Sequence, residues 1–194
     1  MVVPTGTANT ASVIAAFKRL DAEPVLAADP RAVEEADRVV LPGVGAFAPA
    51  INRIDQLGMR EVLTTRIEGG RPTLAICLGM QLLCASSEES PDSAGLGIVP
   101  ETVTRFAAEL RVPQLGWNMV ESDGSTSVEP GWAYFANSYK VPQLPQGWSG
   151  ATTDYGGRFV SAMERGAILA CQFHPELSGA WGSNLLRRWL WKAT

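Results

Sequence analysis

Two patterns of apolar residues alternate along this chain: short continuous runs, and segments in which apolar residues recur at helical spacing. Short apolar runs that end near glycine or proline occur at residues 1–3, 25–26, 37–42 and 71–77, and they predict strands. Segments with apolar residues at helical spacing lie between several of these runs. This alternation is typical of βαβ units, whose strands lie side by side in a parallel sheet. The sequence therefore predicts an α/β fold with a mostly parallel central sheet flanked by helices.

Four segments have helical character. They lie within residues 13–20, 47–68, 78–85 and 179–190, and Gly69-Gly70 ends the second as glycine often ends a helix. Arg66 lies in the stripe of the second segment, and we expect its long side chain to reach solvent. The stripe residues at the two ends of the chain are Val13, Ile14, Phe17, Leu20, Trp181, Leu185, Leu186, Trp189 and Leu190.

The pattern changes between residues 95 and 173 to several short β-type runs. They lie at residues 97–99, 112–120, 132–139, 159–162 and 167–173. We expect them to form hairpins, so the predicted sheet has a β-rich hairpin extension. Neither a repeat nor a linker composition divides the chain, which predicts one domain over residues 1–194.

Composition narrows the possible functions. The 194 residues include 16 Lys and Arg against 20 Asp and Glu, and 46% are hydrophobic. A chain of this length buries a sizeable core by itself, and its mild acidity argues against nucleic-acid binding. Apolar runs fall short of the roughly 20 residues of a membrane span, and the opening lacks a signal-peptide pattern. We therefore expect a cytoplasmic protein that contacts neither membrane nor nucleic acid.

Cysteine and histidine usage limits the available chemistry. None of the three cysteines, Cys77, Cys84 and Cys171, has the spacing of a metal site, so we expect neither a metal nor a cofactor. His174 is the single histidine. Any step that needs an imidazole near neutral pH must use that residue.

Cys77 lies where an apolar strand runs directly into a segment of helical composition. The carboxyl ends of parallel strands form the active-site crevice of α/β proteins, and the first turn of a helix presents N–H groups to a developing oxyanion. This position predicts a nucleophile, whereas an inert buried thiol is the alternative. Cys84 and Cys171 lack such a turn, so we interpret both as core residues.

His174 ends the last apolar run and is followed by Pro175 and Glu176. A cysteine nucleophile needs a base, and the base needs a group that orients its ring. His174 and Glu176 together supply both, although a structural histidine is the alternative. Earlier in the chain, Gly43-Val44-Gly45 offers flexible N–H groups suited to an oxyanion hole, with an ordinary tight turn as the alternative.

Taken together, the three motifs resemble the class I (triad) glutamine amidotransferase family. Within that family the chain is most similar to glutaminase subunits of imidazole glycerol phosphate synthases. The matching segments are Gly6-x-x-Asn9-x-x-Ser12-Val13, Pro42-Gly-Val-Gly-Ala-Phe47, Gly95-Leu-Gly-Ile-Val-Pro100, Val112-Pro-Gln-Leu-Gly-Trp-Asn118, Tyr134-Phe-Ala-Asn-Ser-Tyr139 and Gln172-Phe-His-Pro-Glu-x-Ser178-Gly179.

The resemblance implies an enzyme that hydrolyses L-glutamine to glutamate and ammonia through a thioester. Cys77 would be the nucleophile, His174 the base and Glu176 the carboxylate that orients it. The implied oxyanion hole uses backbone N–H groups of Leu78 and of the Val44-Gly45 turn. The implied glutamine-binding residues are Gly45, Gln81, Ser138 and Tyr139.

The same resemblance implies a partner. Ammonia would pass to a (β/α)8-barrel cyclase subunit in a heterodimer, which would make imidazole glycerol phosphate and an aminoimidazole carboxamide ribonucleotide. Trp117 and Asn118 would lie near the interface, although a tryptophan in this place can also pack within its own chain. Glutaminase activity is expected to stay low until the partner and its ligand complete the oxyanion hole.

Three departures from the family pattern affect these expectations. Pro4-Thr5 and Thr7-Ala8 alter the first turn, Asn137 stands where many members have histidine, and Leu177 stands where many have lysine. The last two changes bear on contact with the barrel. Alternative functions are a stand-alone cysteine amidohydrolase, a glutaminase subunit for a different synthase and a non-catalytic scaffold.

Overall fold

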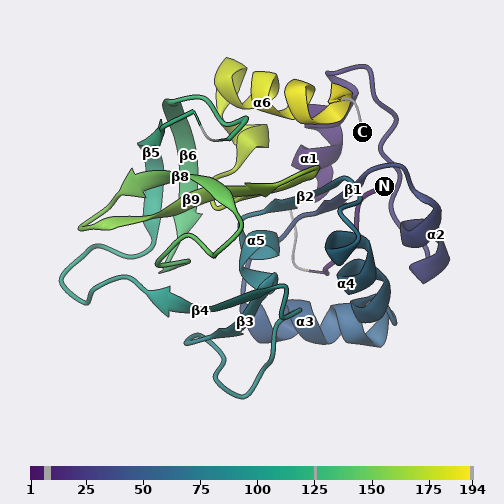
Figure 1. Cartoon of the computed structure of the whole chain (residues 1–194), viewed down its shortest axis with the longest axis horizontal. Coiled ribbons are helices and arrows are strands. Elements are labelled where there is room, and N and C mark those ends of the chain that lie inside the picture. Colours follow the sequence, from purple (N-terminus) through teal and green to yellow (C-terminus); the bar gives the residue numbers. More distant parts are fainter. Residues whose placement is uncertain (7–9, 125, 193–194) are drawn as a thin grey trace.

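The computed structural model describes residues 1–6, 10–124 and 126–192, so Thr7, Ala8 and Asn9 of the first motif lie outside the described residues. Its main feature is a seven-stranded sheet that curls between helices (Figure 1). Across the sheet the strands are β1 (Val39–Leu41), β2 (Thr73–Ile76), β10 (Ile168–Cys171), β9 (Arg158–Arg165), β8 (Ser149–Asp154), β5 (Gln114–Ser122) and β6 (Gly131–Asn137).

The sheet has a parallel half and an antiparallel half. Strands β1, β2 and β10 are parallel, and Val2 adds parallel bridges to Leu26 and Val40. From β10 onward every pairing is antiparallel, through β9, β8 and β5 to β6. The α/β class and the hairpin extension predicted from the sequence are therefore confirmed, and the sheet is mixed, with parallel pairing among β1, β2 and β10.

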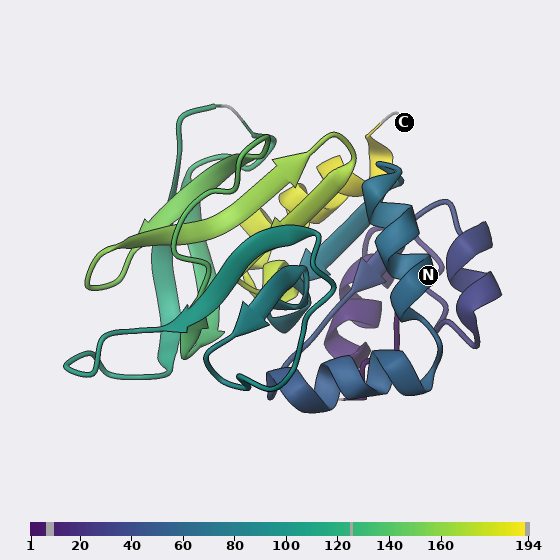
Figure 2. The same ribbon diagram turned by 60° about the horizontal axis from the view of Figure 1, so that its bottom comes forward.

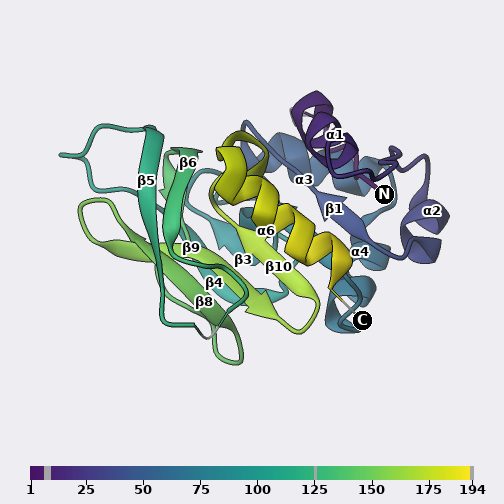
Figure 3. The ribbon, with the colours of Figure 1, turned by 90° about the horizontal axis from the view of Figure 1, so that it is seen from above.

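Helices cover both faces of the parallel half. Helices α1 (Thr10–Lys18) and α6 (Gly179–Trp191) lie on one face, where α6 crosses β10, and α3 (Phe47–Gln56) and α4 (Arg60–Glu68) lie on the other (Figures 1 and 3). Each face of the sheet packs against its own hydrophobic core, and successive strand residues alternate between the two. Leu74 and Ile76 of β2 pack with α1 and α6, whereas Ala75 packs with α3 and α4. This alternation follows from the two-residue period of a strand.

A second, three-stranded sheet corrects one prediction. The helix expected over residues 78–85 ends early, because α5 spans Leu78–Leu82 and Cys84 begins a strand. Carbonyl groups that a longer helix would have used accept hydrogen bonds from residues 95–99 instead, for example Leu82 from Leu96 at 2.8 Å. The sheet consists of β3 (Cys84–Ser87), β4 (Val99–Arg105) and β7 (Tyr139–Lys140), and Figure 2 brings it forward.

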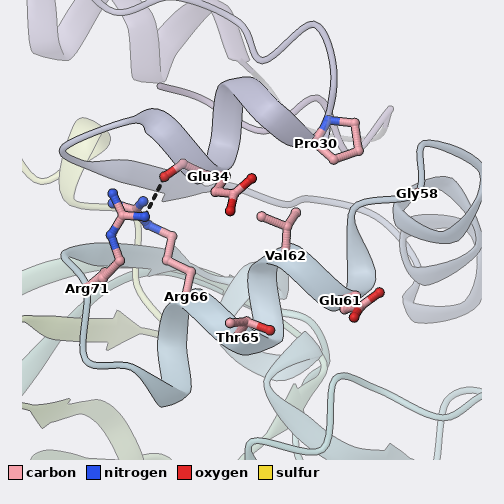
Figure 4. Close-up of a pocket in the computed structure, with 8 residues that line it drawn as sticks. All are labelled: Pro30, Glu34, Gly58, Glu61, Val62, Thr65, Arg66 and Arg71. Atoms are coloured by element: carbon pink, nitrogen blue, oxygen red, sulfur yellow. Dashed lines mark hydrogen bonds between the residues drawn. The ribbon is translucent and has the colours of Figure 1, made fainter.

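Helix α2 (Pro30–Glu35) has no counterpart in the predicted elements. The side chain of Asp29 accepts the Ala32 N–H at 2.9 Å, and Pro30 occupies the first helical position, which are two ordinary start signals. Arg66 of α4, labelled in Figure 4, is buried, contrary to the expectation that it reaches solvent. It donates to carbonyl groups that follow α2.

None of the helices in the described residues combines the length and the apolar character that a membrane span requires. The same part of the chain holds no cluster of three or more His, Cys, Asp or Glu residues able to bind a metal ion.

Candidate active site

Cys77 forms the turn between β2 and α5. Its backbone has φ 53° and ψ −110°, a strained conformation for a residue with a side chain, and its N–H donates to the Cys171 carbonyl at 2.7 Å. Gly79 allows the helix to approach β1, since a Cβ atom there would lie 2.0 Å from the Leu41 carbonyl oxygen. The thiol therefore lies at a sharp strand-to-helix turn, as expected.

Backbone contacts with the antiparallel half fix the position of His174. This residue lies between β10 and a short 3-10 turn, η1 (Pro175–Leu177), and its N–H donates to the Tyr134 carbonyl of β6 at 2.8 Å. The Ser178 hydroxyl donates to the His174 carbonyl at 2.6 Å and accepts the Tyr134 N–H at 2.9 Å. Strand β6 thus holds the imidazole at the end of β10.

The imidazole contacts both the thiol and a carboxylate. His174 Nδ1 lies 2.8 Å from Glu176 Oε1, and the two side chains are only 4% and 3% exposed. Burial lowers the pKa of His174, but hydrogen bonds and charge interactions with Cys77 and Glu176 outweigh it and raise the pKa to about 10. A ring with this pKa holds a proton near neutral pH, so the imidazole can carry the proton that the neighbouring thiol gives up.

A pocket of about 180 Å³ opens beside Cys77. Cavities for drug-sized ligands are typically ~300 Å³ or larger, so this pocket suits a smaller molecule. It brings together residues that are far apart in the sequence, including each residue singled out above for the oxyanion hole and for glutamine. The lining residues are Val44, Gly45, Cys77, Leu78, Gln81, Glu89, Ala136, Asn137, Ser138 and Tyr139.

The turn after β1 lies directly against the start of α5. The Leu78 N–H donates to the Gly43 carbonyl at 3.2 Å, and a Cβ atom on Gly43 would lie 2.8 Å from the Leu78 Cβ. One expected oxyanion donor is therefore already bound to the turn in this conformation. Gly45 has φ 94°, in the region that favours glycine.

Two residues near the thiol were not predicted from the sequence. Glu89 lines the pocket and accepts the Phe47 N–H at 2.8 Å, while the buried Gln172 places its Nε2 atom 3.5 Å from Cys77 Sγ. Glu89 belongs to a polar run that resembles an ordinary exposed loop, so no sequence signal marks it. Gln172 lies two residues before His174, and that position in the motif was its only signal.

The residues expected at a partner interface lie outside the pocket. Trp117 is 54% exposed on β5, and its ring meets that of Tyr134 edge to face with centroids 6.1 Å apart. The side chain of Asn118 donates to the Asp154 carbonyl at 2.9 Å. Of the last two of the three departures from the family pattern, Asn137 lines the pocket, whereas Leu177 is exposed.

A second hollow, lined by described residues beside α2, lacks this chemistry. This hollow of about 390 Å³ (Figure 4) has no cysteine or histidine among its described lining residues. Its Arg66 and Arg71 are bound to backbone carbonyls. The pocket at Cys77 differs from it because its thiol lies next to the His174 imidazole and the Glu176 carboxylate.

Known proteins match the chain over nearly its full length. The family model described as glutamine amidotransferase class-I matches residues 3–193. A protein of Symbiobacterium thermophilum named imidazole glycerol phosphate synthase subunit HisH is 39% identical, with 97% of this chain and 92% of that protein covered. A HisH subunit of Methanothermobacter thermautotrophicus is 38% identical, with 97% and 96% covered.

A longer plant relative and a solved structure add to this match. Arabidopsis thaliana has a chloroplastic imidazole glycerol phosphate synthase hisHF that is 41% identical over 95% of this chain and 33% of that protein. A crystal structure titled glutamine amidotransferase has a TM-score of 0.79 at 22% identity, covering 97% of this chain and 96% of that one, and it supports the fold. The chain belongs to the class-I glutamine amidotransferase family, as its motifs predicted, and its relatives within that family include HisH subunits of imidazole glycerol phosphate synthase.

Proposed function

We propose that this chain is the glutaminase subunit of an imidazole glycerol phosphate synthase, acting in histidine biosynthesis. It hydrolyses L-glutamine to glutamate and ammonia, and a cyclase subunit uses the ammonia. The observation that carries this proposal is the buried Cys77, His174 and Glu176 array beside a pocket sized for a small molecule. The similarity to HisH subunits supports the choice of synthase.

The reaction follows from the positions of three side chains. His174 takes the proton of Cys77, and the sulfur attacks the side-chain amide carbon of glutamine to form a C–S bond. The tetrahedral oxyanion collapses, the C–N bond breaks, and His174 returns the proton so that ammonia leaves. Water, deprotonated by His174, then attacks the glutamyl thioester. Glutamate leaves and the thiol is restored, while Glu176 keeps the ring oriented throughout.

The pocket offers complementary groups to the amino-acid end of the substrate. Gly45, Gln81, Ser138 and Tyr139 hold glutamine, in the roles that the family resemblance implies. Glu89 is the only charged residue among the described residues that line the pocket. We assign it to the α-ammonium group, because a carboxylate facing a cation forms a strong charge-assisted hydrogen bond.

One peptide group controls the oxyanion hole. The Gly43 carbonyl that occupies the Leu78 N–H belongs to the same peptide unit as the Val44 N–H. Rotation of this single peptide would free the Leu78 N–H and turn the Val44 N–H toward the oxyanion, so that both could donate to it. Neighbouring glycines make such a rotation inexpensive, so partner binding can shift the equilibrium between a resting and an active site.

An apolar face on the antiparallel half supports a partner. Leu115, Trp117 and Met119 alternate along β5 and, with Trp132 of β6, form an exposed patch that we call the β5–β6 face. Exposed fractions of 67%, 54% and 56% for Leu115, Trp117 and Trp132 are high for large apolar side chains. We propose that the (β/α)8-barrel cyclase binds here in a heterodimer. The plant relative, in which this chain matches one third of a synthase, supports such a partner.

A cytoplasmic location completes the proposal. Cys77, Cys84 and Cys171 are all free thiols, as expected where disulfides are rare.

The decisive test is glutamine hydrolysis by the purified chain, alone and with the cyclase and its nucleotide ligand. Strong stimulation by the complex is expected. Equal activity without the cyclase would favour a stand-alone cysteine amidohydrolase, and no activity in either condition would favour a scaffold.

Cys77→Ala should abolish glutamine-dependent synthesis and spare synthesis from added ammonia. Loss of both would contradict the assigned role of the thiol.

A further inference from the structure

Three polar groups form a chain of hydrogen bonds that ends at the nucleophile. The Gln81 Nε2 atom donates to the Tyr139 carbonyl at 3.1 Å and to Gln172 Oε1 at 2.8 Å. The Gln172 Nε2 atom lies 3.5 Å from Cys77 Sγ, within hydrogen-bond reach of a sulfur acceptor. The side chain of Gln172 has no exposed surface, so water does not compete for these contacts.

The direction of this series of hydrogen bonds is set by the Tyr139 carbonyl, at the end away from the sulfur. A carbonyl oxygen can only accept, so Gln81 must turn its NH₂ group toward the Tyr139 carbonyl. The second hydrogen of that NH₂ group then faces Gln172, which must present its own oxygen to accept it. The NH₂ group of Gln172 is consequently the end that faces the sulfur. Reversing either amide would place two acceptors or two donors against each other.

We propose that Gln172 is a positioning residue that donates an N–H to Cys77 Sγ and that Gln81 fixes the orientation of this donor. The inference rests on the proposed role of Cys77 as nucleophile and adds a group that acts through it. Gln172 lies on the buried side of the sulfur, whereas the pocket opens on another side. The hydrogen bond therefore restrains the sulfur without occupying the place of the substrate.

Such a donor serves both halves of the reaction. After His174 takes the proton, the sulfur carries a negative charge that the Gln172 N–H stabilises. When water attacks the thioester, the C–S bond breaks and the electron pair returns to sulfur, which again becomes a better acceptor. Gln81 also lines the pocket, so the same relay connects the substrate site with the sulfur.

Alkylation of the folded chain by iodoacetamide, followed over a range of pH, tests the donor directly. The thiolate is the reacting form, and the other two thiols are suppressed: burial raises the pKa of Cys84 to about 12 and raises that of Cys171 as well. Two variants remove the donor, Gln172→Glu with nearly unchanged shape and Gln172→Met without polarity. Each should slow alkylation near neutral pH by about tenfold and move the half-maximal rate to higher pH.

Gln114→Glu is the matched control. Gln114 is also a buried glutamine, and its amide atoms have no hydrogen-bond partner among the described residues. The variant places the same new carboxyl group in the interior without touching the sulfur, so its alkylation profile should remain that of the native chain. Thermal unfolding of each variant establishes that the compared proteins are folded.

Gln81→Glu tests the relay without altering Gln172. A carboxylate at position 81 can accept but not donate, so Gln172 would turn its NH₂ group toward it and its oxygen toward the sulfur. This variant should slow alkylation in the same direction. Combining it with Gln172→Met should add little, because both changes remove the same N–H donor to the sulfur.

The inference and the proposed function can fail separately. If folded Gln172→Glu and Gln172→Met keep the native alkylation profile, Gln172 does not position the sulfur, whatever the glutaminase assay shows. If both variants shift the profile but the native complex does not hydrolyse glutamine, the positioning role stands and the proposed substrate is wrong. A Gln81→Glu profile equal to the native one would overturn the relay.

Discussion

At the scale of single residues, His174 shows how two neighbours can reverse the effect of burial. Removal from water lowers the pKa of the ring, yet Cys77 and Glu176 raise it to about 10, above the ordinary value of 6.5. The folded state therefore binds the proton more tightly than the unfolded state. The resulting contribution to stability is complete below about pH 6.5 and is lost as the pH rises through about 10.

We therefore expect a steeper pH dependence of the free energy of unfolding in the native chain than in His174→Asn, between about pH 6.5 and 10. Denaturant titrations over this range measure it. Cys77→Ala, which removes a cause of the raised pKa, should show an intermediate slope. Parallel curves for the native chain and His174→Asn would mean that the ring is not held protonated.

Glu176 and His174 should differ in how much activity depends on them. Glu176→Gln keeps an oxygen that can accept the Nδ1–H of the ring but loses the charge, whereas His174→Ala removes the only base. Glu176→Gln should retain at least about ten times more glutaminase kcat than His174→Ala. Steady-state kinetics of the complex with cyclase provide the values. A larger loss in Glu176→Gln than in His174→Ala would contradict the assignment of His174 as the base and Glu176 as its orienting group.

At the scale of elements, two arginines anchor helix α2. Arg66 donates to the carbonyls of Val33, Ala36, Asp37 and Pro72 at 2.7–3.1 Å. Arg71 donates to those of Glu34 and Ala36, and Figure 4 shows its bond to Glu34. Burial and the nearby charge of Arg71 lower the pKa of Arg66 to about 10, which still leaves it charged at neutral pH. The guanidinium thus satisfies carbonyl groups at the end of α2 that no other part of the helix can reach.

Arg66→Met should lower the free energy of unfolding by about 2–4 kcal/mol, because it removes a buried guanidinium group that donates to four carbonyls. Arg71→Met changes the same side-chain type at an exposed position and should cost less than about 1 kcal/mol. Urea unfolding of both variants gives the comparison. Equal losses would show that burial of Arg66 does not govern its contribution.

The elements also show where sequence reasoning reaches its limit. Strands β1, β2 and β10 were predictable because each is a continuous apolar run buried on both faces. Strand β8 was missed because Ser149–Asp154 contains only small and polar residues, and it exists through its pairing with β9. The early end of α5 depends on hydrogen bonds from residues 95–99, a long-range contact that no local pattern indicates.

The same limit applies to the candidate site. Cys77 and His174 were predictable because each ends an apolar strand, where α/β proteins form their clefts. Glu89 and Gln172 were not assigned roles, since their positions relative to the thiol arise only when distant segments meet. Nothing in the local sequence distinguishes them from an exposed glutamate or an ordinary core amide.

At the scale of the whole molecule, the two halves of the sheet have different tasks. The parallel half carries Cys77 and His174 at its strand ends, whereas the antiparallel half presents the β5–β6 face to solvent. Tyr134 connects them, because its ring contacts Trp117 and its carbonyl accepts the His174 N–H. Tyr134 therefore links Trp117, which a partner bound to this face would contact, to the backbone of His174.

Trp117→Ser and Trp132→Ser should each weaken binding of the cyclase by at least about tenfold, since exposed tryptophans at interface centres often dominate binding energy. Trp191→Ser is the matched control, because Trp191 is 67% exposed and is the last residue of α6. That end of α6 lies away from β5 and β6 (Figure 3). Titration calorimetry with the cyclase measures all three. Equal weakening by the control would place the interface elsewhere.

The bond between the Leu78 N–H and the Gly43 carbonyl has a consequence for inhibitors. Reagents that only alkylate a thiol need no oxyanion donors, so they should inactivate the chain with or without the cyclase. Glutamine-derived aldehydes instead form a tetrahedral adduct whose oxygen needs those donors. They should bind tightly only to the complex. An inhibitor class of this kind would distinguish enzyme whose oxyanion hole is formed from enzyme in the resting conformation.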